Sequence, residues 1–204
     1  MRSETIGTVA KRYQPTRFKE TLRYRPDSEL PFASATTPFL PLLLDTTYYL
    51  DRSAGRLPPS VRALISSRQH LVYNCAVVCA ELAISIGLLN PEDPRTSSSI
   101  EAIHIHLDEM QRDKTVAPSS EAWTEAAILA GILARTQGLA RPKRNLNPDQ
   151  ACCQEGRRRE LLLDALLYVT ATEQNMLLLS GNTRHLDLLL QLRPSHNVVL
   201  YRPI

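Results

Sequence analysis

The sequence predicts an α/β fold, a three-layer α/β/α sandwich with a short parallel sheet. From Phe39 onward, short apolar runs of strand length alternate with longer stretches of helical periodicity. The runs are apolar throughout rather than at every second residue, as is typical of parallel strands covered on both faces. With 204 residues, of which 43% are hydrophobic, the chain can form one domain with a substantial core.

Four apolar runs are candidate strands, because each is short and bounded by polar or turn-forming residues. The expected strands are Leu42–Asp45, Leu71–Asn74, Met176–Ser180 and Val198–Tyr201.

Six segments between or beside these runs are candidate helices. Ser119 is a favourable N-cap for one of them, and the acidic residue that follows suits the positive end of the helix dipole. The expected helices are Pro59–Ser67, Val77–Leu88, Ser98–Gln111, Ser119–Thr136, Arg157–Gln174 and Thr183–Leu192.

Residues 1–36 are polar, basic and without a sustained apolar period, so we expect a flexible basic arm in front of a folded domain at 37–204. Between Met1 and Arg25, seven Lys or Arg residues stand against two acids. The arm is either a solvated tail or a segment that holds RNA, DNA or an acidic partner through phosphate contacts. A second loop is expected at Arg141–Gly156, which is rich in Pro and Asn.

The cysteines and the expected lack of a signal or membrane-spanning segment predict a cytoplasmic protein. The formal net charge of +3 is compatible with a nucleic-acid partner but does not establish one. We expect neither a secretory signal nor a membrane-spanning helix, since the apolar segment at residues 38–50 is interrupted by Asp45 and is too short. Cys75, Cys79, Cys152 and Cys153 do not form a disulfide framework and suit buried thiols in a reducing compartment.

Three carboxylates lie within or directly after apolar segments, at Asp45, Glu81 and Asp164. Ionised carboxylates are seldom buried unless they are paired or bind a metal, because their desolvation is costly. Asp45 follows a predicted strand, at the edge of a parallel sheet where ligands bind. Taken singly, each acid also has a structural explanation: Asp45 as a helix cap, Glu81 on a solvent-facing side and Asp164 near a helix start.

If these three acids meet, their charges repel one another, by about 4 kcal/mol per pair at 4 Å and an effective dielectric constant near 20. Such a cluster persists by binding protons or a hard cation. Mg²⁺ or Mn²⁺ prefers carboxylate and water oxygens, and can activate a water molecule against a phosphodiester. The pattern therefore predicts a metal-dependent nuclease site.

Four motifs occur in an order that resembles the PIN-domain family, and in particular the VapC-type toxin ribonucleases of bacterial toxin–antitoxin systems. The resemblance runs from about Phe39 to Tyr201. Its motifs are Leu44-Asp45-Thr46-Thr47, Cys79-Ala80-Glu81-Leu82, Leu163-Asp164-Ala165-Leu166 with Thr170-Ala171, and Ser180-Gly181-Asn182-Thr183-Arg184.

This resemblance implies a Mg²⁺-dependent endoribonuclease, a cognate antitoxin protein as partner, and a homodimer. Asp45, Glu81 and Asp164 match the first three acids of the family, and Ser180 matches its hydroxyl position. The family commonly has a fourth acid after the fourth strand, where this chain has His185, flanked by Asn182 and Asp187. We expect Asn182 or Asp187 to position water or a second ion.

The sequence does not favour a zinc site, a histidine ligand pair or a phosphatase site. Adjacent cysteines are unsuitable spacing for zinc, and His104 and His106 are expected to face solvent. A haloacid dehalogenase phosphatase needs an acid two residues after Asp45, where this chain has Thr47. Arg157-Arg158-Arg159 is either a phosphate contact or an exposed helical turn.

Three functional hypotheses stay open from the sequence. The first is the metal-dependent ribonuclease toxin. The second is a PIN-like module that has lost catalysis and binds RNA or a protein, as the change at His185 allows. The third is an α/β protein of another family, in which the carboxylates are structural.

Overall fold

A computed structural model describes residues 6–13, 17–34, 37–139 and 157–204, and these form two compact units. The helical unit comprises the described residues of Met1–Leu30, Pro118–Gln174 and Thr183–His196. The sheet unit comprises those of Pro31–Ala117, Asn175–Asn182 and Asn197–Ile204.

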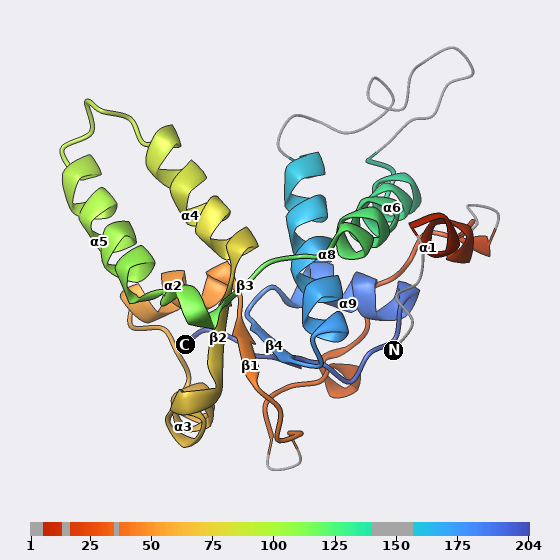
Figure 1. Cartoon of the computed structure of the whole chain (residues 1–204), viewed down its shortest axis with the longest axis horizontal. Helices are drawn as coiled ribbons and strands as arrows, with labels where there is room; N and C mark the ends of the chain where they lie inside the picture. Colours follow the sequence, from red (N-terminus) through yellow and green to blue (C-terminus); the bar gives the residue numbers. More distant parts are fainter. Residues whose placement is uncertain (1–5, 14–16, 35–36, 140–156) are drawn as a thin grey trace. The chain divides into compact units, whose positions relative to one another are not determined.

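The sheet unit contains a sheet of five described strands in the order β3-β2-β1-β4-β5, and every pairing is parallel (Figure 1). This confirms the predicted α/β class and the short parallel sheet. The four predicted strands are present with bounds shifted by at most one residue, and the two-residue strand β3 was not predicted. The strands are β1 (Leu42–Leu44), β2 (Val72–Cys75), β3 (Thr115–Val116), β4 (Leu177–Ser180) and β5 (Val198–Leu200).

The register of β1 against β4 positions the carboxyl ends of these strands. Leu44 lies opposite Leu179, and the backbone N–H of Asp45 donates to the carbonyl oxygen of Leu179 at 3.1 Å. All residues of β1, β4 and β5 are buried. Because β1 and β4 are apolar up to Leu44 and Leu179, the next side chains, Asp45 and Ser180, lie at the same level.

Four α-helices of the sheet unit connect or flank the strands. Two of them, α4 and α5, contact one another and form the hairpin drawn in yellow and green in Figure 1. Helix α3 has the predicted bounds, α4 and α5 differ from the prediction by one or two residues, and α2 was not predicted. The helices are α2 (Thr46–Ser53), α3 (Pro59–Ser67), α4 (Ala76–Leu88) and α5 (Thr96–Glu109).

Helix α2 begins directly after β1 because Asp45 caps it. The carboxylate of Asp45 accepts from the backbone N–H of Thr46, which satisfies one of the N-terminal N–H groups of the helix. Tyr48 and Tyr49 are buried on this helix. The capping role that the sequence left open for Asp45 is therefore present.

The helical unit is built around the contact between α6 and α8, with α1 packed on α6 and α9 on both α8 and α6. Its core contains the fully buried side chains of Leu129, Leu133, Leu166 and Leu189. Helices α6 and α8 differ from the prediction by one residue, and α9 has the predicted bounds. The helices are α1 (Ile6–Arg12), α6 (Ser120–Thr136), α8 (Arg157–Glu173) and α9 (Thr183–Leu192).

Regular structure occurs where the sequence suggested only an arm. Within the predicted flexible arm, Ile6–Arg12 forms α1 with Val9 buried, and Phe32 forms a parallel bridge with Leu200. Helix α1 is too short for its period to be recognised, and packing against α6 stabilises it. The division into 1–36 and 37–204 stays a prediction, and the predicted loop Arg141–Gly156 lies outside the described residues.

Among the helices described, none is both long and apolar enough to cross a membrane.

Candidate carboxylate site

Asp45 stands at the centre of a hydrogen-bonded cluster in the sheet unit. Its side chain is 5% exposed. One carboxylate oxygen, Oδ1, accepts from the N–H of Thr46 at 2.6 Å, and Oδ2 accepts from the hydroxyl of Thr47 at 2.8 Å and from the hydroxyl of Ser180. Three donors offset the cost of burying this carboxylate and fix its orientation.

The backbone of the loop after β4 adds two hydrogen bonds to this cluster. The N–H of Gly181 donates to the hydroxyl of Thr47, and the N–H of Asn182 donates to the hydroxyl of Ser180, both at 2.9 Å. Predicted site residue Asn182 is thus one hydrogen bond from the residue that holds Asp45. Gly181 suits this turn because a Cβ there would lie 3.2 Å from the ring of Tyr201.

Glu81 joins the same cluster from α4. Its side chain is half-buried, and its Oε2 accepts a hydrogen bond from the hydroxyl of Thr46. Thr46 therefore donates to both acids, through its backbone N–H to Asp45 and through its side chain to Glu81. Two of the three predicted metal-binding acids are brought together by one residue.

Asp164 lies in the helical unit, on α8. Its Oδ2 is 2.5 Å from Nδ1 of His185 on α9, and both side chains are largely shielded from solvent. The histidine that stands where the resemblance places a fourth acid is therefore bonded to the third acid. A ring N–H can donate to this carboxylate, which an acid at the same position cannot do when ionised.

Asp187 is also in the helical unit and is 1% exposed. Its two oxygens accept from Arg25, Oδ2 from the backbone N–H at 2.8 Å and Oδ1 from Nε at 2.6 Å. The cation that offsets Asp187 thus belongs to this chain, and it comes from the segment predicted to be an arm. Metal binding by Asp187 stays a prediction.

The donor set of the sheet unit is compatible with magnesium, although in the described ranges no group of three His, Cys, Asp or Glu side chains could hold a metal ion. Mg²⁺ is commonly bound by one or two carboxylates, with waters and substrate phosphates completing its coordination. Asp45 and Glu81, joined by Thr46, supply donors of this kind. Hydrogen bonds to the carboxylates from neighbouring side chains are typical of metal sites.

The sequence did not predict the hydrogen bonds made by the hydroxyl groups of Thr46, Thr47 and Tyr201. The side chains of Thr46 and Thr47 directly follow Asp45 in the sequence, and that adjacency is the signal that could have indicated them. Tyr201, just after β5, donates to Asp51 at 3.0 Å beside Gly181. Burial raises the pKa of the Tyr201 phenol, so it stays protonated and donates.

The cysteines and histidines singled out from the sequence differ in their exposure to solvent. Cys75 is buried, and burial raises the pKa of its thiol to about 11; burial raises the pKa of the Cys79 thiol as well. Cys152 and Cys153 lie outside the described residues. His104 is exposed as expected, whereas His106 is 6% exposed, which corrects the expectation that it faces solvent. A phosphate-binding role for Arg157-Arg158-Arg159 stays a prediction.

His106 is buried because two neighbours surround its ring. Its Nε2 lies 2.5 Å from the hydroxyl of Ser53, and its ring meets that of Tyr49 edge to face at 5.4 Å. Helical periodicity in α5 alone could not reveal that this face packs against α2.

Comparison with known proteins gives weak similarities. No family model matches the sequence, and a search of curated proteins finds no match. One solved structure, FitAB bound to an IR36 DNA fragment, is similar with a TM-score of 0.45 at 15% identity, over 79% of this chain and 94% of that one. VapBC2 from Rickettsia felis, bound to a DNA fragment from the promoter, is similar with a TM-score of 0.43 at 15% identity, over 80% of this chain and 98% of that one. Both TM-scores are low, so neither similarity assigns a function to this chain.

Proposed function

We propose that this protein is a Mg²⁺- or Mn²⁺-dependent endoribonuclease, the toxin of a type II toxin–antitoxin pair, in which Asp45 and Glu81 bind the metal. Asp164 is included as a third acid on the motif resemblance alone. The observation that supports this most directly is the convergence of Asp45 and Glu81 on Thr46. Oxygen donors held in this way suit a hard divalent cation.

The metal, when bound, would neutralise the phosphodiester and lower the pKa of a coordinated water. The residues of this chain hold the carboxylates ready for it. Ser180 and Thr47 fix the Asp45 carboxylate, and the hydroxyl of Thr46 fixes that of Glu81. Asn182, which follows Ser180 at the end of β4, supplies an amide that can orient water or the RNA phosphate.

Cleavage of total RNA and of a tRNA pool by the purified protein in Mg²⁺ tests the proposal. We expect the wild type to cleave RNA at discrete positions and EDTA to abolish this cleavage. Asp45→Asn, Glu81→Gln and Asp164→Asn should each reduce the cleavage rate by at least 100-fold. Asp108→Asn and Glu101→Gln are matched controls, since both side chains are exposed on α5, and they should cleave as the wild type does. Cleavage that persists in EDTA or in all three variants would refute the metal-dependent mechanism.

A catalytically inactive PIN-like module that binds RNA or a protein is the second candidate. The observation that favours it is the bond between His185 and Asp164, because this bond gives the third acid a partner from the chain itself. This candidate predicts no cleavage by the wild type and RNA or partner binding that is the same in EDTA and in Asp45→Asn.

The partners are proposed from the motif resemblance alone. A cognate antitoxin should bind the protein and block its cleavage of RNA, and the protein without antitoxin should be a homodimer. Light scattering during gel filtration measures the second of these: a monomer at micromolar concentration would contradict it.

A further inference from the structure

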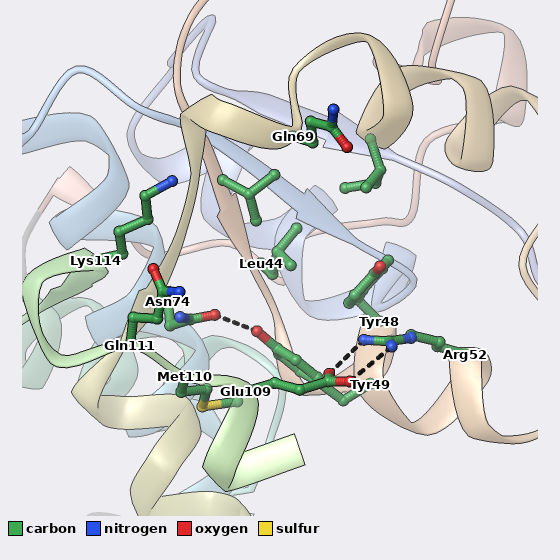
Figure 2. A pocket seen from close by; sticks show the side chains of 12 residues that line it. Leu44, Tyr48, Tyr49, Arg52, Gln69, Asn74, Glu109, Met110, Gln111 and Lys114 are labelled. Atoms are coloured by element: carbon green, nitrogen blue, oxygen red, sulfur yellow. Dashed lines mark hydrogen bonds and ion pairs between the residues drawn. The ribbon is translucent and has the colours of Figure 1, made fainter. Parts of the chain in front are cut away.

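The sheet unit contains a pocket with a volume of about 300 Å³, whose lining does not include Asp45 or Glu81 (Figure 2). Its lining combines apolar and aromatic side chains with amides and charged groups. It is lined by Leu44, Tyr48, Tyr49, Arg52, Ile65, Gln69, Val72, Asn74, Glu109, Met110, Gln111 and Lys114.

The charged side chains of this pocket leave one uncompensated cation. Arg52 and Glu109 form a two-fold hydrogen-bonded ion pair at 2.6 and 2.9 Å, which raises the pKa of the Arg52 guanidinium and lowers that of the Glu109 carboxyl. Both therefore stay ionised and offset each other. Lys114 donates to the carbonyl oxygen of His70 at 3.0 Å, and among the described residues no other acceptor is found for its ammonium group.

Three amide side chains reach the pocket, from Gln69, Asn74 and Gln111. Asn74 is 8% exposed and is oriented by the phenol of Tyr49, which donates to its Oδ1. That bond directs the Asn74 oxygen towards Tyr49 and leaves the NH₂ group as its donor to a ligand. In the described structure, no hydrogen bond occupies the side chains of Gln69 and Gln111, which lie on either side of Leu44 in Figure 2.

We propose that this pocket binds a nucleoside monophosphate, with the base between the apolar walls and the phosphate at Lys114. Amide side chains pair with the donor and acceptor edges of nucleobases, and apolar and aromatic side chains cover their faces. A single free cation suits one phosphate, and the volume lies at the lower end of the range for small-ligand pockets. A metal ion is not a suitable occupant, because the single acid of the lining is paired with Arg52.

The pocket also adjoins the carboxylate cluster along the chain. Leu44 lines the pocket and Asp45 is the next residue, so their Cα atoms are about 3.8 Å apart. Because side chains alternate along a strand, the two point to different sides of the end of β1. Nucleotide binding in this pocket does not rest on the proposed ribonuclease function.

Binding measured in EDTA separates this proposal from the nuclease. Isothermal titration calorimetry would be run with AMP, GMP, CMP and UMP, and with single-stranded 2′-O-methyl tetranucleotides that lack the reactive hydroxyl, using the wild type and Asp45→Asn. We expect saturable binding of at least one mononucleotide by both proteins. Tetranucleotide binding at least tenfold tighter than that of the best mononucleotide identifies a strand as the natural ligand, and equal affinity identifies the free nucleotide.

Pocket variants decide whether the recess is the site. Gln69→Ala and Lys114→Met should each weaken binding at least fivefold, because they remove a base contact and the phosphate contact. Gln174→Ala and Lys11→Met are matched controls with exposed side chains in the helical unit, and they should bind as the wild type does. No saturable binding, or equal affinity in pocket and control variants, would overturn the proposal even if the protein cleaves RNA.

Discussion

Ser180, the last residue of β4, donates its hydroxyl hydrogen to the buried carboxylate of Asp45, the first residue after β1. The parallel register that places Leu44 opposite Leu179 brings the two side chains to the same level. Both residues have at most 5% of their surface exposed. The site therefore depends on strand pairing as much as on the acids themselves.

Ser180→Ala should lower the free energy of unfolding by about 1–3 kcal/mol, because a buried carboxylate loses one of its three donors. Urea denaturation with an unchanged m-value measures the change. Ser67→Ala is the control, since its exposed hydroxyl donates only to a carbonyl of its own helix, and it should stay within about 0.5 kcal/mol of the wild type. If both variants lose the same free energy of unfolding, the hydrogen bond to Asp45 does not contribute more than an exposed one.

Thr46 is the residue through which the metal proposal can be tested without touching an acid. Thr46→Val keeps the backbone N–H to Asp45 and removes the hydroxyl that holds Glu81. We expect the Mg²⁺-induced rise in melting temperature to require 10- to 100-fold more metal in this variant, as is typical when a carboxylate ligand loses its hydrogen-bond partner. Thr46→Ser should restore the wild-type response.

The control for Thr46→Val is Thr124→Val, whose hydroxyl donates to a carbonyl one turn earlier in α6. Its response to Mg²⁺ should equal that of the wild type. A wild-type melting temperature that does not respond to millimolar Mg²⁺ or Mn²⁺ would count against any metal site at Asp45 and Glu81.

Much of the fold could be predicted because it is encoded locally. The runs Leu42–Leu44 and Leu177–Leu179 have no polar residue to suggest anything but buried strands, and α9 has a clear apolar period. Strand β3 could not be predicted in this way. It is two residues long and exists because Asn74 and Cys75 pair with it. Non-local pairing of this kind leaves no periodic signal.

In the candidate site, too, the local sequence indicates some residues, while others depend on tertiary contacts. Acids within apolar segments are unusual enough that Asp45 and Glu81 could be identified from their sequence neighbours alone. The resemblance implied the hydroxyl role of Ser180, and its hydrogen bond to Asp45 agrees with it. The register of β4 on β1 that makes this bond possible leaves no local signal in the sequence. The partners of Asp164 and Asp187 depend equally on tertiary packing, and the bond from Arg25 to Asp187 joins residues 162 positions apart.

His106 should make the protein less stable in mild acid. Burial and then the nearby charge of Arg52 lower the pKa of its imidazole, while Glu109 acts weakly in the opposite direction. Below the ordinary pKa of 6.5 the unfolded chain takes up a proton that the folded chain does not, so unfolding becomes more favourable as the pH falls. The urea midpoint of the wild type should therefore decline as the pH is lowered through 6.5.

His106→Gln removes the titrating group and should flatten this acid-side decline, whatever its effect on stability at pH 8. His104→Gln, which changes an exposed side chain two residues away on α5, should keep the wild-type slope. If the three proteins share one pH profile, another group causes the decline.

Glu125 is the electrostatic centre of the helical unit. It is 2% exposed on α6 and accepts from Arg12 at 3.1 Å, from Arg193 at 2.8 Å and from the phenol of Tyr13. Arg12 ends α1 and Tyr13 follows it, so their hydrogen bonds to this carboxylate link α1 to α6. Burial, and next the bond to Glu125, raise the pKa of Tyr13 to about 12.

Glu125→Gln should destabilise the protein by about 3 kcal/mol or more, because removing one partner of a buried ion pair leaves the other charge uncompensated. Arg193, whose side chain is 19% exposed, would bear most of this cost, since Arg12 is 40% exposed and can be hydrated. The same variant should lower the pKa of Tyr13, which ultraviolet difference titration against Tyr13→Phe can detect. Glu121→Gln, one turn earlier on α6, should change neither quantity. A Tyr13 pKa that stays at its wild-type value in Glu125→Gln would show that burial alone sets it and that Glu125 does not fasten α1.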